Sequence, residues 1–195
     1  MPASHVVLLR HGETEWSRAG RHTGWTDIPL TDTGRHQAKL AGWALRFWTF
    51  ARVLTSPLSR ARETAELAGL ENAQVRADLR EWNYGEVEGR TTAEVQAQHP
   101  GWFLWVDGCT GGETVDEVGA RADSVIDEVR SSDGDVCLVA HGHLLRILTA
   151  RWLGLPAVGG RYFALDAAAI SVLGYEHDEP VMQRWNDTTY LDRDA

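Results

Sequence analysis

The sequence predicts an α/β protein, built as a three-layer α/β/α sandwich around a mainly parallel central sheet. Short apolar runs, which suit buried strands, alternate along the chain with longer segments whose apolar residues recur at helical spacing. Strands that alternate with helices tend to pair in parallel and to be covered on both faces. A hydrophobic content of 43% over 195 residues is enough for a real core, and we expect a single domain over 1–195.

Strands are expected where a short apolar run ends at polar or turn residues. They are His5–Arg10, Arg52–Thr55, Ala73–Arg76, Asp135–Ala140, Ala169–Tyr175 and Val181–Trp185. A turn at 177–180 joins the last two strands. The tail from Asp187 onward is expected to be poorly ordered, because chain ends often are.

Helices are expected between these strands. Their ranges are about 31–48, 56–69, 91–98, 114–130 and 142–153, with a small aromatic segment at 102–106. In the first of them Trp43 and Phe47 are expected to widen the apolar face. In the second, Ser56 is expected to cap the helix and Pro57 to occupy its first turn.

The charge and the cysteines exclude several classes of protein. The net charge of −9 argues against nucleic acid and anionic membrane surfaces, which require a basic footprint. There is no apolar run long enough to span a bilayer and no secretory leader pattern, so a cytoplasmic location is expected. Cys109 and Cys137 form neither a disulfide framework nor a metal-binding spacing, and we expect both to be unreactive.

Polar residues stand where three separate elements meet one edge of the predicted sheet. Arg10 and His11 end the first strand, Arg60 lies early in the helix after the second, and His141 ends the fourth. In open α/β sheets ligands bind beyond the carboxyl ends of the strands. Guanidinium groups match phosphate geometry, so these four side chains predict a compact cationic site for one phosphoryl group.

The chain resembles the histidine phosphatase superfamily, also called the phosphoglycerate-mutase-like family. The resemblance rests on four motifs in family order. They are Arg10-His11-Gly12-Glu13-Thr14 with the following Gly20-Arg21-His22-Thr23-Gly24, then Ser56-Pro57-Leu58-Ser59-Arg60, then Glu81-Trp82-Asn83-Tyr84-Gly85, then Val139-Ala140-His141-Gly142. The resemblance implies a phosphoglycerate mutase-like fold with a helical cover at about 82–132, inserted over the active site.

The chemistry of the site is expected to be metal-independent hydrolysis of a phosphomonoester. A neutral imidazole can attack phosphorus, so His11 is the predicted nucleophile, with Arg10, Arg60 and His141 stabilising the transition-state charge. The resemblance implies Glu81 as the general acid. Asp27 and Glu13 are the alternative carboxylates.

Substrate phosphate is expected to meet further donors around this site. The predicted contacts are the hydroxyl groups of Ser17 and Thr23 and the backbone at Gly24 and Gly142, together with Arg10, Arg60 and His141. Many family members carry Asn at the position of Ser17, so this contact is expected to be shorter or missing.

The remaining histidines are expected to be surface or structural residues. They are His22, His36, His99 and His177. His143 forms a His-x-His pair with His141, a pattern that also suits a metal. We do not favour a metal site there, since no carboxylate or cysteine in the nearby sequence completes a ligand set, and we expect no cofactor.

Two activities within the family remain open, and hydrolysis is favoured over mutase transfer. Family mutases carry an adjacent arginine pair after the acid, whereas the basic residues here, Arg90, Arg121 and Arg130, are separated. The chain looks most like the small bacterial broad-specificity acid phosphatases. A phosphoglycerate mutase-like transferase and a non-catalytic phosphate-binding protein are the alternatives.

The substrate is expected to be a small phosphorylated metabolite, and a homodimer is a hypothesis only. The sequence leaves open the identity of the substrate and any residual mutase activity. It also leaves open whether the aromatic residues of the cover line the pocket; these are Trp102, Phe103 and Trp105.

Overall fold

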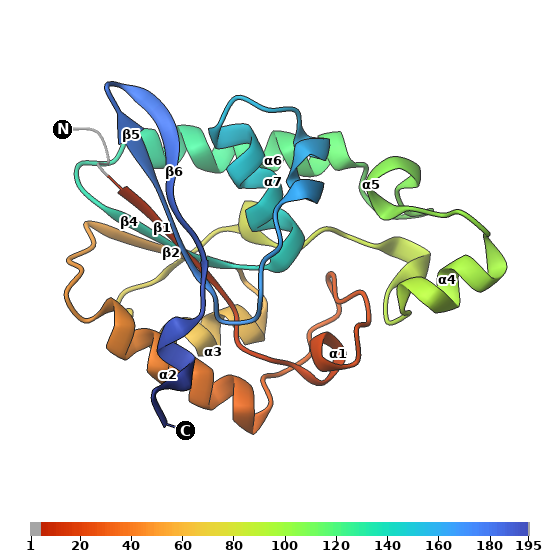
Figure 1. The fold of residues 1–195 in the computed structure, drawn as a ribbon, viewed down its shortest axis with the longest axis horizontal. Helices are drawn as coiled ribbons and strands as arrows, with labels where there is room; N and C mark the ends of the chain where they lie inside the picture. The colour runs from red at the N-terminus through yellow and green to blue at the C-terminus, as the bar shows by residue number, and fades with distance from the viewer. Residues whose placement is uncertain (1–4, 195) are drawn as a thin grey trace.

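The computed structural model describes residues 5–194, and one six-stranded sheet forms its centre (Figure 1). The strands are β1 (His5–Arg10), β2 (Arg52–Thr55), β3 (Gln74–Val75), β4 (Val136–Ala140), β5 (Ile170–Glu176) and β6 (Glu179–Asp187). They lie in the order β3-β2-β4-β1-β5-β6. The first four in this order are parallel, while β5 and β6 are antiparallel to their neighbours. The prediction of a mainly parallel sheet is confirmed.

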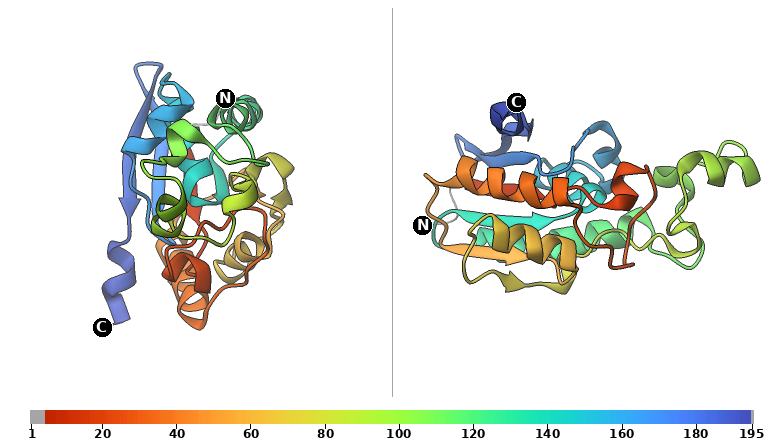
Figure 2. Two further views of the ribbon diagram at one scale, coloured as in Figure 1. Left: turned by 90° about the vertical axis from the view of Figure 1, so that its right-hand side faces the viewer. Right: turned by 90° about the horizontal axis from the view of Figure 1, so that it is seen from below.

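Helices cover both faces of the sheet, which makes three layers (Figures 1 and 2). One face carries α2 (Asp32–Leu45) and α3 (Ser59–Leu67), and the other carries α6 (Val115–Arg130) and α7 (Gly142–Trp152). Side chains of a strand alternate between faces, so Leu138 of β4 packs in the cluster with α6 and α7, and Val139 packs in the cluster with α2 and α3. Both residues are fully buried.

The shorter helices gather beyond one end of the sheet. They are α1 (Glu15–Arg18), α4 (Thr92–Gln98) and α5 (Leu104–Asp107), with 3₁₀ turns at Ala77–Leu79 and Gly85–Val87. Figure 1 shows α4 and α5 as a projection past the sheet, on the same side as α1. The loop after α1 joins this projection, because His22 donates its N–H to Arg90 O at 2.9 Å.

Two helix predictions were wrong in detail. α3 begins at Ser59 after an N-cap at Leu58 that makes no side-chain bond, so Ser56 does not cap this helix and Pro57 precedes it. α2 ends at Leu45. Phe47 therefore follows the helix and is 83% exposed.

Trp43 and the third strand differ from the expectation as well. Trp43 lies within α2 and is 40% exposed, so it does not extend the buried face of that helix. The strand expected over Ala73–Arg76 is reduced to two residues at the sheet edge, Gln74 and Val75, both exposed.

The C-terminal tail is packed against the body of the protein, contrary to the prediction of poor order; Ala195 lies outside the described residues. β6 reaches Asp187, and a 3₁₀ turn at Thr189–Asp194 contacts α2. Tyr190 from this turn is buried in the cluster beneath α2, and its hydroxyl donates a hydrogen bond to Ala168 O. The buried ring and its hydrogen bond tie the tail to the body of the protein.

Two glycines allow the loop after β1 to approach α2. A Cβ at Gly12 would lie 2.3 Å from Gly34 O, and a Cβ at Gly34 would lie 2.1 Å from Glu13 O. Neither position accepts a side chain, because each faces backbone that cannot move away. This close contact fixes the path of the chain just after His11.

Replacing Tyr190 should measure how strongly the tail stabilises the fold. Tyr190→Ala removes a buried ring and should lower the free energy of unfolding by about 3–5 kcal/mol, whereas Tyr190→Phe removes one hydrogen bond and should cost about 1 kcal/mol. Urea unfolding followed by circular dichroism gives both values. Tyr162→Ala, at a side chain that is 73% exposed, is the control and should change stability by less than about 0.5 kcal/mol.

Candidate active site

The carboxyl ends of neighbouring strands bring the predicted histidines together. Parallel pairing sets Arg10 of β1 opposite Ala140 of β4, so His11 and His141 leave adjacent strands at the same level. Their ring centroids lie 5.1 Å apart. Ser56 follows the end of β2, the next strand, and its hydroxyl lies 2.7 Å from His141 Nε2.

His11 is held as a neutral imidazole with one free lone pair. Its Nδ1 lies 2.7 Å from Gly12 O, and because a carbonyl can only accept, Nδ1 carries the proton and Nε2 does not. Burial lowers the pKa of His11 well below its ordinary value, and the charges of Arg60 and Arg10 lower it further. An unprotonated Nε2 is the state that can attack phosphorus.

His141 lies beside His11 with both ring nitrogens engaged. Arg60 Nε donates to His141 Nδ1 at 3.2 Å, so the proton of the neutral ring lies on Nε2 and is donated to the Ser56 hydroxyl. Burial, followed by the charge of Arg60, lowers the pKa of His141 well below its ordinary value. His141 is fully buried and stands behind the nucleophile.

The two arginines are used differently. Arg60 is fully buried and donates to the backbone carbonyls of Thr23, Gly24 and Thr26 at 2.7–3.2 Å, which holds the loop of residues 23–26 over the sheet edge. Arg10 donates through Nη1 to Leu165 O at 2.5 Å, while its buried Nε finds no partner among residues 5–194. A buried N–H donor without an acceptor is costly, and an anion oxygen would satisfy it.

The carboxyl group of Glu81 is buried and held by backbone N–H donors. Oε1 accepts from Trp82 N and Leu144 N, both at 2.9 Å, and Oε2 accepts from His143 N at 3.0 Å. Two of these donors belong to the first turn of α7, the helix that begins just after His141. The acid predicted from the third motif therefore lies at the helix end that follows the second histidine.

Arg10, His11 and Glu81 border one cavity of about 210 Å³, whereas Arg60 and His141 are not among the described residues that line it. It is lined by Arg10, His11, Ser17, Gly20, Arg21, His22, Thr23, Glu81, Tyr84, Gly142, His143, Arg146 and Leu165. Gly142 matters for its width, because a Cβ there would stand 3.5 Å from Arg10 Cζ and 3.7 Å from Glu81 Oε2. The volume suits a phosphoryl group with a small leaving portion.

The predicted phosphate contacts from α1 and the loop after it have partners within the protein. The Ser17 hydroxyl donates to Thr14 O at 3.0 Å, and the Thr23 hydroxyl donates to Arg21 O at 3.1 Å, although both residues line the cavity. The Gly24 N–H donates to Glu88 Oε1 at 2.7 Å, and Gly24 is not among the described residues that line the cavity. The structure thus places Ser17 and Thr23 at the site and directs Gly24 away from it.

The far wall of the cavity was missed by sequence reasoning. His22, expected to be a surface or structural residue, lines the cavity, and its ring packs at a tilt against that of Tyr84, with the centroids 5.1 Å apart. The Tyr84 hydroxyl lies 2.6 Å from His143 Nδ1. Arg146, one turn further along α7, completes this wall. His22 and Tyr84 stand inside motifs already recognised, whereas the helical spacing from His143 to Arg146 was the only signal for Arg146.

The aromatic residues of the cover form a second layer behind this wall. Trp105 is buried, with its ring 5.2 Å from His143 and the Arg146 guanidinium 4.7 Å above it. Trp102 packs edge-on at 5.6 Å against His22. Phe103 is 44% exposed. None of the three is among the described residues lining the cavity, so two of them support its wall instead.

The other candidate groups lie elsewhere. Glu13 accepts from the Thr31 hydroxyl at 2.8 Å, and Asp27 accepts from the backbone and hydroxyl of Ser59 at 2.8 Å. Neither is among the described residues lining the cavity. Burial raises the pKa of the Cys109 thiol to about 12, which makes that thiol unreactive at neutral pH.

Two features are absent from residues 5–194, a cluster of metal ligands and a membrane-spanning helix. That range holds no group of three or more His, Cys, Asp or Glu side chains able to bind a metal ion. It also holds no helix with the length and apolar character needed to cross a membrane.

Comparisons with known proteins agree with the motifs. The model of the histidine phosphatase superfamily (branch 1) matches residues 6–188. An acid phosphatase of Mycobacterium tuberculosis is 46% identical over 176 residues, which cover 88% of this chain and 87% of that protein. A probable phosphoglycerate mutase of Photorhabdus laumondii is 34% identical over 206 residues, covering 97% and 96%.

A solved structure extends the likeness to three dimensions. Mycobacterial glucosyl-3-phosphoglycerate phosphatase, in complex with VO3, has a TM-score of 0.86 and 31% sequence identity to this chain. The match covers 95% of this chain and 100% of that one. The whole α/β body described above is therefore shared, and the resemblance inferred from the four motifs is confirmed.

The buried histidines should make stability depend on pH. The pKa values of His11, His141 and His143 are all lowered by burial, so the unfolded chain binds more protons than the folded one below about pH 6.5. The free energy of unfolding should therefore be unaffected by these groups above that pH. Below it, stability should fall by up to about 1.4 kcal/mol per pH unit for each histidine.

Urea unfolding between pH 7.5 and about 5 measures this slope. His143→Gln should reduce it by up to about 1.4 kcal/mol per pH unit. The exposed His99→Gln variant is the control and should leave the slope as it is. A slope that is the same in the wild type and in the His143→Gln variant would contradict the assignment of a neutral buried ring.

Proposed function

The chain belongs to the histidine phosphatase superfamily, and from the geometry of its cavity we propose that it hydrolyses phosphate monoesters through a phosphohistidine on His11. One observation carries this proposal. His11, whose Nε2 is unprotonated, and Arg10, whose Nε–H has no partner among residues 5–194, line the same small cavity as Glu81. Phosphoryl transfer requires a nucleophile, a hydrogen-bond donor that binds the phosphate oxygens, and a proton source for the leaving group.

In the first step His11 Nε2 attacks phosphorus. The new N–P bond forms as the bond from phosphorus to the ester oxygen breaks, and Glu81 donates its proton to the leaving oxygen. In the second step water attacks the phosphohistidine. The N–P bond breaks, the water proton passes to Glu81, and inorganic phosphate leaves with the enzyme restored.

Positive charge for the transferring group comes from the protein. Arg10 lines the cavity. Arg60 does not line it, but its guanidinium donates a hydrogen bond to His141, the ring beside His11. Burial lowers the pKa of both guanidinium groups. Glu81 opposes that shift when it is ionised, and a bound phosphate dianion would oppose it too. We therefore propose a reaction that needs no metal ion.

Hydrolysis is favoured over mutase transfer by where the basic residues between Glu81 and His141 lie. Arg90 donates to Glu94 O at 2.9 Å, the Arg130 guanidinium stacks 5.1 Å over Trp152, and Arg121 binds backbone beneath Glu81. None of these three is among the described residues lining the cavity. Arg21 and Arg146 do line it, and they are the groups through which an anionic leaving portion would be recognised.

The remaining expectations stay predictions. They are a small phosphorylated metabolite as substrate, a cytoplasmic location, and no association with nucleic acid or membrane. A homodimer stays a hypothesis.

The nucleophile can be tested with p-nitrophenyl phosphate. The wild type should hydrolyse it in the presence of EDTA, and His11→Ala should lower kcat by at least about 10³-fold, because the covalent route is lost. Acid-labile, base-stable phosphate should accumulate on the wild type at His11 after rapid quenching. His99→Gln is the control and should retain full activity. Undiminished hydrolysis by His11→Ala would exclude the covalent role.

Substrate partition tests the choice between phosphatase and mutase. With 3-phosphoglycerate and 2,3-bisphosphoglycerate present, release of inorganic phosphate should exceed formation of 2-phosphoglycerate by at least about tenfold. The physical reason is that none of Arg90, Arg121 and Arg130 is among the described residues lining the cavity. Both reactions can be measured by phosphorus nuclear magnetic resonance. Isomerisation faster than hydrolysis would reverse the assignment.

A further inference from the structure

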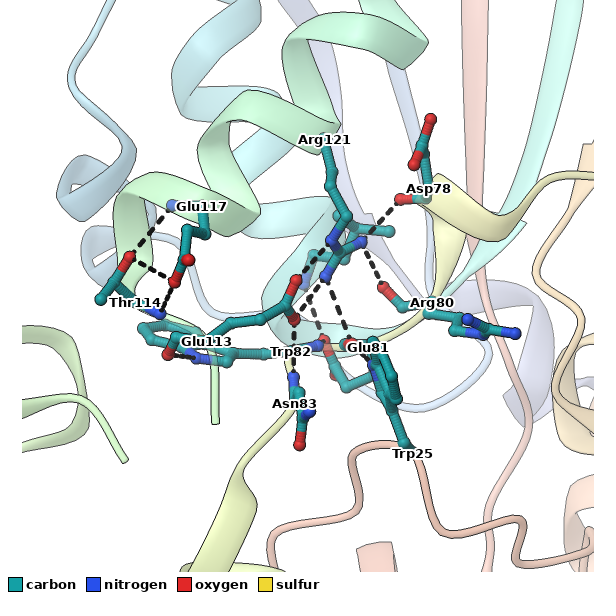
Figure 3. A network of polar contacts seen from close by, with 11 residues as sticks. Trp25, Asp78, Arg80, Glu81, Trp82, Asn83, Glu113, Thr114, Glu117 and Arg121 are labelled. Atoms are coloured by element: carbon teal, nitrogen blue, oxygen red, sulfur yellow. Dashed lines mark hydrogen bonds and ion pairs between the residues drawn. The ribbon is translucent and has the colours of Figure 1, made fainter. Parts of the chain in front are cut away.

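The segment that carries Glu81 has no secondary structure to satisfy its backbone. Residues 81–84 belong to neither helix nor strand. Arg121 of α6 donates to carbonyl groups at the start of this segment and just before it, and the Trp25 indole N–H donates to Glu81 O at 3.0 Å (Figure 3). The guanidinium donates through Nη1 to Asp78 O at 2.8 Å and to Arg80 O at 3.0 Å, and its Nη2 lies 3.4 Å from Glu81 O. One guanidinium thus binds three carbonyl groups around the predicted acid.

Glu113 binds the same guanidinium from its other side and also binds Trp82 and Asn83, the two residues after Glu81 (Figure 3). Its carboxylate accepts from Arg121 Nε at 2.7 Å and from Nη2 at 2.8 Å. Oε2 also accepts from Asn83 N at 2.9 Å, and the Glu113 backbone bonds Asn83 O at 2.9 Å and the Trp82 indole N–H at 2.7 Å. Both partners of the ion pair are partly buried, with side chains 17% and 16% exposed.

The elements behind this pair are rigid. Thr114 caps α6 in a reciprocal bond with Glu117, which fixes the start of the helix directly after Glu113. α6 packs along α7, whose first turn binds the Glu81 carboxyl through two N–H groups. The backbone of Glu81 is therefore tied to one helix and its carboxyl to the neighbouring helix.

We propose that Arg121 and Glu113 are positioning residues for the general acid, and that they set where the Glu81 carboxyl stands relative to the leaving oxygen. This inference rests on the proposed function, because it requires Glu81 to be the acid. Only an arginine can form two bonds with a carboxylate while also donating to carbonyl groups on its other side. Lysine keeps the charge and loses this planar arrangement.

The leaving group provides the readout that a purely structural role would not change. An alkoxide needs a proton as it departs, whereas p-nitrophenolate is stable enough to leave without one. Displacing the acid should therefore slow cleavage of an alkyl phosphate and spare that of p-nitrophenyl phosphate. A loss of folded protein would lower both rates equally. The value of kcat/KM is the right measure, because it reports formation of the phosphoenzyme.

The test compares Arg121→Lys and Glu113→Gln with the wild type on glycerol phosphate and p-nitrophenyl phosphate. We expect kcat/KM for glycerol phosphate to fall by about 10²-fold and that for p-nitrophenyl phosphate to fall by less than about threefold. Arg151→Lys is the matched control. Arg151 also forms two bonds with a carboxylate of α6, Asp123, at 2.8 and 2.9 Å. The Arg151→Lys variant should leave kcat/KM unchanged for both substrates.

A double-mutant cycle with Glu81→Gln completes the test. If Arg121 acts through the acid, Arg121→Lys should have no further leaving-group effect in the Glu81→Gln background. Equal losses on both substrates, or a leaving-group effect that survives without the acid, would overturn the positioning role alone. A Glu81→Gln variant that cleaves glycerol phosphate at the wild-type rate would overturn both this inference and the assignment of the acid.

Discussion

The in-register parallel pairing of β1 with β4 is the constraint on which the site depends. Leu8 pairs with Leu138 and Arg10 with Ala140, so the residues that follow the two strands emerge at one height. A slip of one residue would turn every side chain of the strand to the opposite face and separate the two histidines. The buried apolar residues on both faces of β4 make such a slip costly.

The site places buried cations beside buried neutral histidines, an arrangement that favours an anion. Arg10 and Arg60 are taken out of water, and burial lowers the pKa of each. Burial, and after it the charges of these arginines, lowers the pKa of His11 and His141 and so favours their neutral rings. A phosphoryl group would satisfy the free Arg10 Nε–H and offset the burial of the two guanidinium groups, so binding and activation of the nucleophile have a common origin.

The acid side of the site is built by a different principle. His11 and His141 inherit their positions from the sheet, whereas Glu81 lies in an irregular segment whose backbone depends on side chains from α6. A segment of this kind can cross over the sheet edge and face the nucleophile, which no strand of the sheet can do. Its carbonyl groups must then find donors elsewhere, and the Arg121–Glu113 pair meets that need.

The sequence alone determined the mainly parallel sheet and the four motifs, because strand runs and motif spacing are local patterns. His11 was predicted from its place at the end of a strand, whereas Glu81 was implied only by the resemblance to the family. Only the tertiary structure decided which donors remain for a ligand. The Gly24 amide belongs to Glu88, and the tail after Asp187 packs instead of fraying. The tertiary structure also decided that His22 lines the cavity. These outcomes depend on partners distant along the chain, and local spacing carries no record of which distant group satisfies a given donor.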